Sequence, residues 1–279
     1  GLDSQVSSSQ LLRKLCRLGF EEKLLSGKIP KEKHQEYTDR CKLEIDTLEE
    51  LHFIDYVLLV WKTIDKARQL GVFIDYGRGS CVSSLVFWLL KITGCDPIKY
   101  GLFFNRFISK SRAKSKLIDN ELWLQTDLIP DADLNLGNGR DEVIKWLKEM
   151  YPGSVSKIAN ISTLTGKILI KDVYKVVEEV NEEEAKYAAD LVERRFGVVQ
   201  DLEEVYKENS IFKDWADKHP VTYRICLSLK NLNRQYSTHA SGYLISRDEI
   251  TNHSPLFLDS EKEVTCAYTM DNVQCIKLD

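Results

Sequence analysis

The chain has 279 residues, enough for one large domain or two modest ones with a full hydrophobic core. Hydrophobic residues make up 43% and charged residues 29%, which excludes a predominantly disordered chain. No apolar run is long enough to span a bilayer, and the net charge of −4 argues against nucleic-acid binding over the whole surface. Seven cysteines without a C-x-x-C pair predict reduced thiols in the cytoplasm.

The first part of the chain predicts three helices. Serines 7–9 offer an N-cap for the first, and apolar periodicity predicts the others over about 31–51 and 54–70. Gly71 is a plausible C-cap for the third helix. Residues 72–74 then predict a short strand.

A glycine-containing turn, Gly77-Arg78-Gly79-Ser80, follows this strand and precedes an apolar helix predicted over 82–92. Small residues let a phosphate approach the backbone, and the N–H groups at a helix start can donate to it. The turn lacks the Lys-Ser/Thr of a P-loop and the spacing of a Rossmann fingerprint, so both classes are disfavoured. Taken alone, the turn is also compatible with a purely structural role.

Asp131 and Asp133 lie on a strand predicted over 127–134 and entered through Pro130. Alternate residues of a strand share one face, so the two carboxylates lie side by side and repel unless cations separate them. Paired carboxylates suit Mg²⁺, and two such ions can promote phosphoryl transfer. A lone D-x-D is more often a surface turn, so this interpretation depends on its context.

The second half of the chain predicts a helical region between strands. Val143, Leu147 and Met150 fall on one face of a predicted helix. The remaining predicted elements are a strand over 158–161, a helical region over 163–236 with a capping-box-like Asn181/Glu184 pair, and strands over 243–245 and 275–278. This order predicts a helical insertion between two parts of one sheet domain.

Two stretches, 98–118 and 221–240, contain no acidic residue. Their basic residues are Lys99, Arg106, Lys110, Arg112, Lys114 and Lys116 in the first, and Arg224, Lys230 and Arg234 in the second. A single basic run is usually a solvated helix face. Two such runs, the first leading to the aspartate pair, favour phosphate binding.

Longer motifs extend in one order from about Leu11 to Asp279. They include Gly77–Ser80, Ser84–Val86, Lys91–Pro97, Tyr100–Phe107, Pro130–Asp133, Gly139–Ile144, Val155–Ile158, Ile170–Val173, His239–Gly242 and Ile276–Asp279. In this order they resemble the palm and thumb of a family C DNA polymerase, the bacterial DNA polymerase III alpha type.

The resemblance implies a mixed α/β (α+β) fold: a polymerase-beta-like nucleotidyltransferase palm with an inserted helical thumb. The first part of the palm, with the N-terminal helices, would comprise residues 1–161. The thumb would comprise 162–238, and the return segment of the palm 239–279.

The resemblance also implies the site residues. Asp131, Asp133 and Asp279 correspond to the catalytic carboxylates that bind two Mg²⁺ ions, with Mn²⁺ as a substitute. The nucleotide-binding positions are Arg78, Gly79, Ser80, Arg106, Arg112 and Lys277. The positions expected to contact DNA are Lys157, Lys167, Lys171, Arg224, Lys230 and Arg234.

The implied function is template-directed addition of dNTPs to a primer 3′-hydroxyl in a bacterial cytoplasm, with a phage-encoded protein as a variant. The implied partners are primer–template DNA, dNTP, and a second polypeptide or missing C-terminal region that supplies fingers and clamp-binding parts; no membrane is expected. Two alternatives stay open: an incomplete or split-polymerase fragment that binds DNA or a partner subunit, and another polymerase-beta-like nucleotidyltransferase.

The sequence departs from the family's pattern at several positions. Asn135 and Leu136 stand where a third acid and an aromatic residue are usual, and Ser241 replaces a usual glycine. Residues 110–126 form a longer link than the family's, which predicts an inserted loop.

Overall fold

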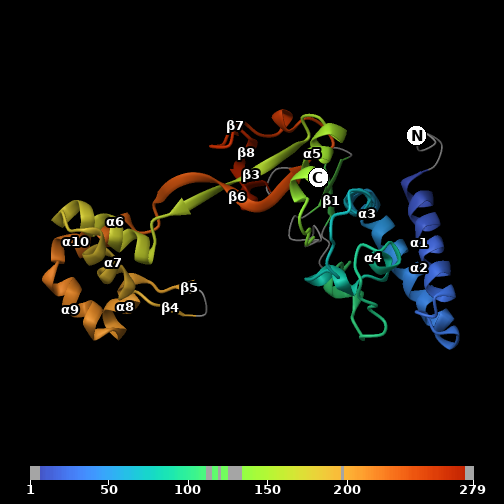
Figure 1. Ribbon diagram of the computed structural model, residues 1–279, viewed down its shortest axis with the longest axis horizontal. Coiled ribbons are helices and arrows are strands. Elements are labelled where there is room, and N and C mark those ends of the chain that lie inside the picture. The colour runs from blue at the N-terminus through green and yellow to red at the C-terminus, as the bar shows by residue number, and fades with distance from the viewer. Residues whose placement is uncertain (1–6, 111–114, 119–120, 125–133, 196–197, 274–279) are drawn as a thin grey trace. The chain divides into compact units, whose positions relative to one another are not determined.

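The structure, a computed structural model, describes residues 7–110, 115–118, 121–124, 134–195 and 198–273. It divides into two compact units (Figure 1). Unit 1 comprises Gly1–Val155, Ser246–Glu249 and Gln274–Asp279, and unit 2 comprises Ser156–Ile245 and Ile250–Val273. Helices predominate beside a four-stranded mixed sheet, which confirms the predicted mixed α/β class. Among the described residues, no helix combines the length and apolar character needed to cross a membrane.

Unit 1 begins with three long helices at the predicted places. They are α1 (Ser8–Leu25), α2 (His34–Glu50, after the 3-10 turn η1, Lys31–Lys33) and α3 (Ile54–Gln69). Ser7 caps α1 in a capping box with Gln10, which satisfies backbone donors that a helix start leaves unpaired. Gly71 follows α3 with φ 71°, a conformation that glycine adopts without strain.

The core of unit 1 forms where α1–α3 meet the short helix α4 (Leu85–Leu89). Leu12, Ile64 and Phe87 are fully buried there. A Cβ at Gly19 would lie 2.2 Å from the carbonyl oxygen of Leu89, so glycine is required where α1 approaches α4. The segment that carries the glycine turn is therefore anchored on the helical core.

The helix predicted over 82–92 is broken into two short pieces. A 3-10 turn, η2 (Ser80–Ser83), comes first, and α4 begins only at Leu85. Ser84 adopts an extended conformation between them, and its hydroxyl accepts a hydrogen bond from the Phe87 N–H. The prediction of one continuous helix was wrong because Ser84 acts as an N-cap rather than as a helical residue.

The strand predicted over 72–74 is reduced to a single antiparallel bridge between Ile74 and Leu136. Two backbone hydrogen bonds flank it, from Asp75 N to Asn135 O (3.2 Å) and from Gly137 N to Phe73 O (2.8 Å). The strand predicted over 127–134 lies outside the described residues except for Leu134.

The remaining elements of unit 1 are η3 (Phe104–Arg106), the antiparallel pair β1 (Ser115–Ile118) and β2 (Glu121–Leu124), and α5 (Arg140–Met150). Val143 and Leu147 of α5 are buried, as predicted. Met150, on the same helix face, is 44% exposed. It is the last residue of the helix, where the chain turns away.

Unit 2 contains the four-stranded sheet, in the order β6-β3-β8-β7. Its strands are β3 (Val155–Thr163), β6 (Asn233–Ile245), β7 (Leu256–Leu258) and β8 (Val264–Thr269). Strand β3 runs parallel to β8, and β8 runs antiparallel to β7. The strands predicted over 158–161 and 243–245 are present, each as part of a longer strand. The turn η5 (Ile250–Asn252) and the short helix α11 (Met270–Val273) complete the strand-rich part.

Five helices and a small hairpin lie between β3 and β6 in the sequence. They are α6 (Gly166–Glu178), α7 (Glu182–Asp190), the pair β4 (Arg194–Arg195) and β5 (Val198–Val199), α8 (Leu202–Glu208), α9 (Ser210–Lys218) and α10 (Pro220–Leu229). Asn181 caps α7 by accepting from the Glu184 N–H at 2.9 Å, as predicted. Fully buried Leu169, Phe212 and Cys226 form part of their shared core.

The helical region predicted to reach residue 236 ends earlier, at Leu229. Asn231 takes a left-handed conformation (φ 65°) and its N–H donates to the Leu164 carbonyl. The chain then enters β6 at Asn233, so the last four predicted helical residues are strand. The strand predicted over 275–278 lies outside the described residues. The two compact units do not identify a palm or a thumb. The palm–thumb boundaries at 161/162 and 238/239 therefore stay a prediction.

Candidate nucleotide site around the glycine turn

The glycine turn presents backbone and a basic side chain at the surface of unit 1. Gly77 and Gly79 have φ values of 91° and 73°, in the region that favours glycine. Arg78 and Gly79 are exposed, and Ser80 is half-buried at the start of η2. The exposed backbone at Gly79 is open to a phosphate, whereas the Cβ side of Gly77 is packed against Thr93 and Val82.

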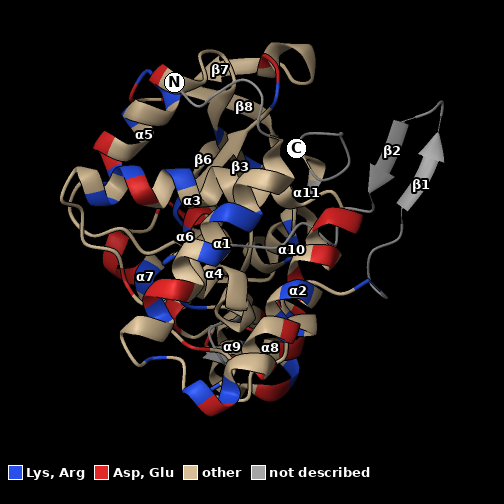
Figure 2. Ribbon diagram, turned by 90° about the vertical axis from the view of Figure 1, so that its right-hand side faces the viewer, with Lys and Arg blue, Asp and Glu red and all other residues tan. Residues whose placement is uncertain are grey.

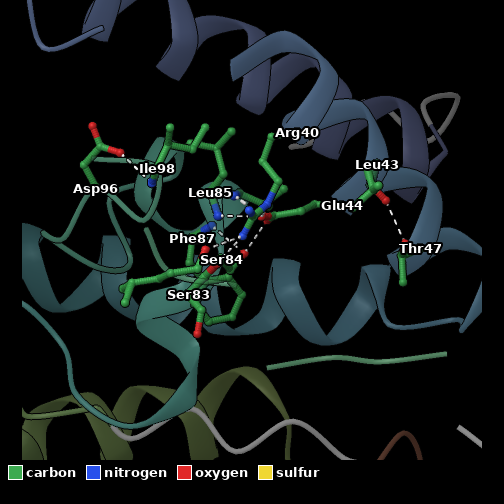
Figure 3. A network of polar contacts seen from close by, with 12 residues as sticks. Arg40, Leu43, Glu44, Thr47, Ser83, Ser84, Leu85, Phe87, Asp96 and Ile98 are labelled. Carbon is green, nitrogen blue, oxygen red and sulfur yellow. Dashed lines mark hydrogen bonds and ion pairs between the residues drawn. The ribbon is translucent and has the colours of Figure 1, made fainter. Parts of the chain in front are cut away.

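The N-terminus of α4, by contrast, already holds an anion from the chain itself (Figure 3). The fully buried Glu44 carboxylate accepts hydrogen bonds from the Leu85 and Val86 N–H groups, each at 3.0 Å. It also accepts one from the Ser84 hydroxyl at 2.8 Å. The helix terminus that the sequence offered to a phosphate is thus occupied, and η2 is only a four-residue 3-10 turn. Backbone contacts to a phosphate would therefore come from the turn rather than from the start of α4.

Arg40 links Glu44 to two backbone segments, one before α4 and one after it. Its Nε donates to Glu44 Oε1 at 2.6 Å, and its Nη2 donates to the carbonyls of Ser83 (3.0 Å) and Leu102 (3.1 Å). Ser83 ends η2, Leu102 lies just before η3, and η2 packs against η3. One guanidinium therefore holds together the segments that carry Ser80 and the exposed Arg106.

The Glu44 side chain is fully buried, and that of Arg40 is 20% exposed. Burial raises the pKa of Glu44, and the Leu85 and Val86 N–H groups and Arg40 oppose that rise. A charged hydrogen bond in such surroundings is strong, because little water competes with it.

Sequence reasoning did not identify Arg40 or Glu44. The helical period of α2 could have revealed them, because it places Glu44 on the same buried face as Tyr37, Ile45 and Leu48. A carboxylate on an apolar helix face four residues after an arginine indicates a buried pair.

Asn135, one of the departures from the family pattern, contacts a carboxylate. Its side-chain amide donates to Asp75 Oδ2 at 3.2 Å, three residues before Arg78. A carboxylate at position 135 would face Asp75 at that distance and be repelled. The amide is therefore compatible with Asp75 where an acid would not be, and it joins the segment after Asp133 to the segment before the turn.

The predicted carboxylates Asp131, Asp133 and Asp279 lie outside the described residues, as do Arg112 and Lys277. Within the described part of the chain, no group of three His, Cys, Asp or Glu side chains gathers as metal ligands would. As a donor set, three carboxylates are the hard oxygen ligands that Mg²⁺ prefers. These site assignments stay predictions.

Most of the residues predicted to contact DNA form ion pairs within unit 2. The pairs are Lys157 with Asp259 (2.9 Å) and Glu261 (3.0 Å), Lys167 with Asp190 (2.9 Å), Lys171 with Glu182, Lys230 with Asp201 (2.7 Å) and Glu203 (3.0 Å), and Arg234 with Asp172 (2.9 Å). Arg224 is exposed on α10, and its guanidinium forms no ion pair with any described residue. Acidic and basic residues are interspersed along the helices (Figure 2).

These pairs change the protonation equilibria of both partners. The bond from Asp259, followed by that from Glu261, raises the pKa of Lys157 despite partial burial. Hydrogen bonds from Lys171 and Lys175 lower the pKa of Glu182 to about 2. A DNA phosphate would have to displace these internal acids to reach the lysines.

Comparison with known proteins places the chain in a family. It matches the family described as the bacterial DNA polymerase III alpha NTPase domain over residues 10–279, and it belongs to that family. This confirms the resemblance to a family C polymerase.

Curated relatives named "DNA polymerase III subunit alpha" agree with that assignment. Those from Campylobacter jejuni and Bacillus subtilis are each 30% identical over 98% of this chain, which covers 22% and 23% of their lengths. The relative from Ureaplasma parvum is 30% identical over 99% of the chain and 27% of its own length. The chain thus spans about a quarter of the relatives it matches.

Proposed function

We propose that this chain provides the palm and thumb of a template-directed DNA polymerase that adds dNTPs to a primer 3′-hydroxyl. The observation that carries the proposal is the match to the polymerase III alpha NTPase family over nearly the whole chain. The glycine turn supports it, because Gly79 leaves the backbone open to a phosphate beside exposed Arg78.

In this proposal Asp131, Asp133 and Asp279 hold two Mg²⁺ ions. When bound, these ions activate the primer 3′-hydroxyl and stabilise the charge that develops on the leaving pyrophosphate. Mn²⁺, which also accepts carboxylate oxygens, is a substitute.

The other proposed residues bind and orient the nucleotide. Arg78 and Arg106 neutralise phosphate charge, and the Ser80 hydroxyl donates to a phosphate oxygen. Arg112 and Lys277 add positive charge. The Arg40–Glu44 pair acts through them by fixing η2 against η3, so it is a positioning pair rather than a catalytic one.

The thumb helices are proposed to contact the duplex backbone through Lys157, Lys167, Lys171, Arg224, Lys230 and Arg234. Such contacts position DNA without reading its sequence. Arg224 is the candidate that needs no internal ion pair to be displaced.

The alternative is an incomplete or split-polymerase fragment. Because the chain spans about a quarter of its relatives, it could bind primer–template DNA or a partner subunit without completing incorporation alone. Fingers and clamp-binding parts would then come from a further segment or polypeptide.

Primer extension with Mg²⁺ and dNTPs tests the proposal. The wild-type chain and Asp39→Ala are expected to extend the primer, because Asp39 is exposed on α2, whereas Asp133→Ala is expected to abolish extension. Extension by Asp133→Ala would overturn the assignment. A chain that binds primer–template but extends in no variant would favour the incomplete-fragment alternative.

A further inference from the structure

A basic pocket lies in unit 1, next to the glycine turn but not lined by Gly77–Ser80. Its volume is about 360 Å³, and it forms where the C-terminal parts of α1 and α3 meet segments 72–76 and 91–94. Four cations line it, Lys23, Lys28, Arg68 and Lys91, against one acid, Asp75.

Lys23 is the least expected of these cations, because it is only 7% exposed. Its ammonium lies 4.8 Å from the centroid of the Trp88 ring and has no hydrogen-bond acceptor among the described residues. Burial, and then the charge of Lys28, lower the pKa of Lys23. The charges of Glu22 and Asp96 act in the opposite direction on that pKa. Neither carboxylate is hydrogen-bonded to the Lys23 ammonium within the described part of the chain, so an anion in this pocket would supply a direct partner.

The acids near the pocket are engaged elsewhere. Asp75 accepts hydrogen bonds from the Tyr76 N–H (2.7 Å) and the Asn135 amide (3.2 Å). Glu22 pairs with Lys91 at 2.6 Å, which accounts for one of the four cations. Arg68 donates to the Lys91 carbonyl, and a guanidinium carries five N–H donors. Positive charge therefore remains in excess.

Thr93 provides an independent indication of a ligand. It lines the pocket, it is 3% exposed, and its Oγ1 has no hydrogen-bond partner within the described part of the chain. Leaving a buried hydroxyl unpaired costs free energy. An unpaired hydroxyl in a pocket that four cations also line can donate to an oxyanion.

The rim adds two exposed aromatic rings. Phe73 and Tyr76 line the pocket and are 70% and 74% exposed. Aromatic faces of this kind can stack on a nucleobase. A volume of about 360 Å³ lies near the lower end of small-molecule sites.

We propose that this pocket binds the diphosphate group of a small molecule, through Lys23, Lys28, Arg68 and the Thr93 hydroxyl. The source of that group is either free pyrophosphate or a nucleoside diphosphate. The site goes beyond the proposed polymerase function and does not require it.

Calorimetric titration with pyrophosphate in EDTA tests the proposal, because removal of divalent ions leaves the carboxylate site unable to hold pyrophosphate. Lys28→Gln and Arg68→Gln are each expected to weaken binding about tenfold, as loss of a charged hydrogen bond would. Thr93→Val should also weaken binding while preserving thermal stability, since its hydroxyl has no partner to lose. Lys14→Gln, an exposed charge change on α1, is the matched control and should bind normally.

Titration with dADP separates the two sources. If a nucleotide is the ligand, Tyr76→Ala should weaken dADP binding and leave pyrophosphate binding unchanged; if free pyrophosphate is the ligand, dADP should bind no better than pyrophosphate. An Asp131→Asn/Asp133→Asn protein should retain binding, so failure of the polymerase proposal would not remove this site.

Three results would overturn the inference. The first is no pyrophosphate binding in EDTA. The second is equal binding by Lys28→Gln, Arg68→Gln, Thr93→Val and the control. The third is an Arg68→Gln protein that loses affinity for single-stranded DNA but binds pyrophosphate normally, which would assign the pocket to a nucleic-acid backbone.

Discussion

Two acidic residues, Glu44 in unit 1 and Glu182 in unit 2, each pair with basic side chains but in opposite surroundings. The side chain of Glu44 is fully buried and that of its partner Arg40 is 20% exposed. Glu182 is 55% exposed, and its partners Lys171 and Lys175 are 38% and 42% exposed. The buried pair joins three segments of backbone, whereas the exposed pairs hold lysines that a ligand could compete for. Burial therefore separates an ion pair that holds backbone segments together from exposed ion pairs that a ligand could replace.

The largest expected effect is on Glu44. Glu44→Gln would turn an amide NH₂ toward backbone N–H donors or Arg40, and it would leave the Arg40 charge without its partner. Breaking a buried pair in this way costs about 3–5 kcal/mol in the free energy of unfolding. Urea denaturation measures the loss.

Glu36→Gln is the matched control, because Glu36 is an exposed residue of the same helix with a 3.5 Å contact to Lys33. It should change stability by no more than about 0.5 kcal/mol. Equal losses in the two variants would mean that the Arg40–Glu44 pair does not hold η2 and η3 in place.

The sequence predicts those features that local signals specify. The N-cap at Ser7, the cap at Asn181 and the periods of the long helices all appear as expected. The break at Ser84 was missed because it depends on Glu44, forty residues away, whose carboxylate binds Ser84 and the two following N–H groups. Tertiary contacts of this kind are not visible in an apolar run over 82–92.

For the candidate site, the sequence identified the glycine turn but not the ion pairs around the basic residues. The motifs identify the glycine turn, and its two positive φ values follow from the glycines themselves. The internal acids that pair with the predicted DNA-binding lysines were not foreseen, because Glu182, Asp190 and Asp259 approach them only through the fold. The Asp75–Asn135 contact likewise depends on the pairing of distant segments.

A smaller effect is expected on DNA binding. Glu182→Gln would release Lys171, so affinity for primer–template DNA should rise and its dependence on salt should become steeper. One added phosphate contact changes the slope of log K against log salt by about 0.9. Fluorescence anisotropy over a salt series measures both quantities.

Glu183→Gln removes the same charge one residue away, in the same first turn of α7, and serves as the control. A similar slope change in both variants would show a general charge effect rather than release of Lys171.

The smallest expected effect is on how the thermal stability of the chain varies with pH in the acidic range. The pKa of Glu182 falls from 4.5 to about 2 in the folded chain, because Lys171 and Lys175 stabilise its charged form. Its contribution is therefore present above pH 4.5 and disappears as pH falls through about 2. In Glu182→Gln, thermal unfolding between those pH values should depend less on pH than in the wild type. An unchanged pH profile would contradict the assigned pairing.

The proposed aspartate metal site is tested most directly by Mn²⁺ binding in the presence of dNTP, measured as loss of the free-ion EPR signal. This measurement does not need the rest of a polymerase. The wild type and Asp39→Asn are expected to bind Mn²⁺, and Asp131→Asn/Asp133→Asn is expected to bind it much more weakly. Equal binding by all three proteins would contradict a metal site built on these aspartates.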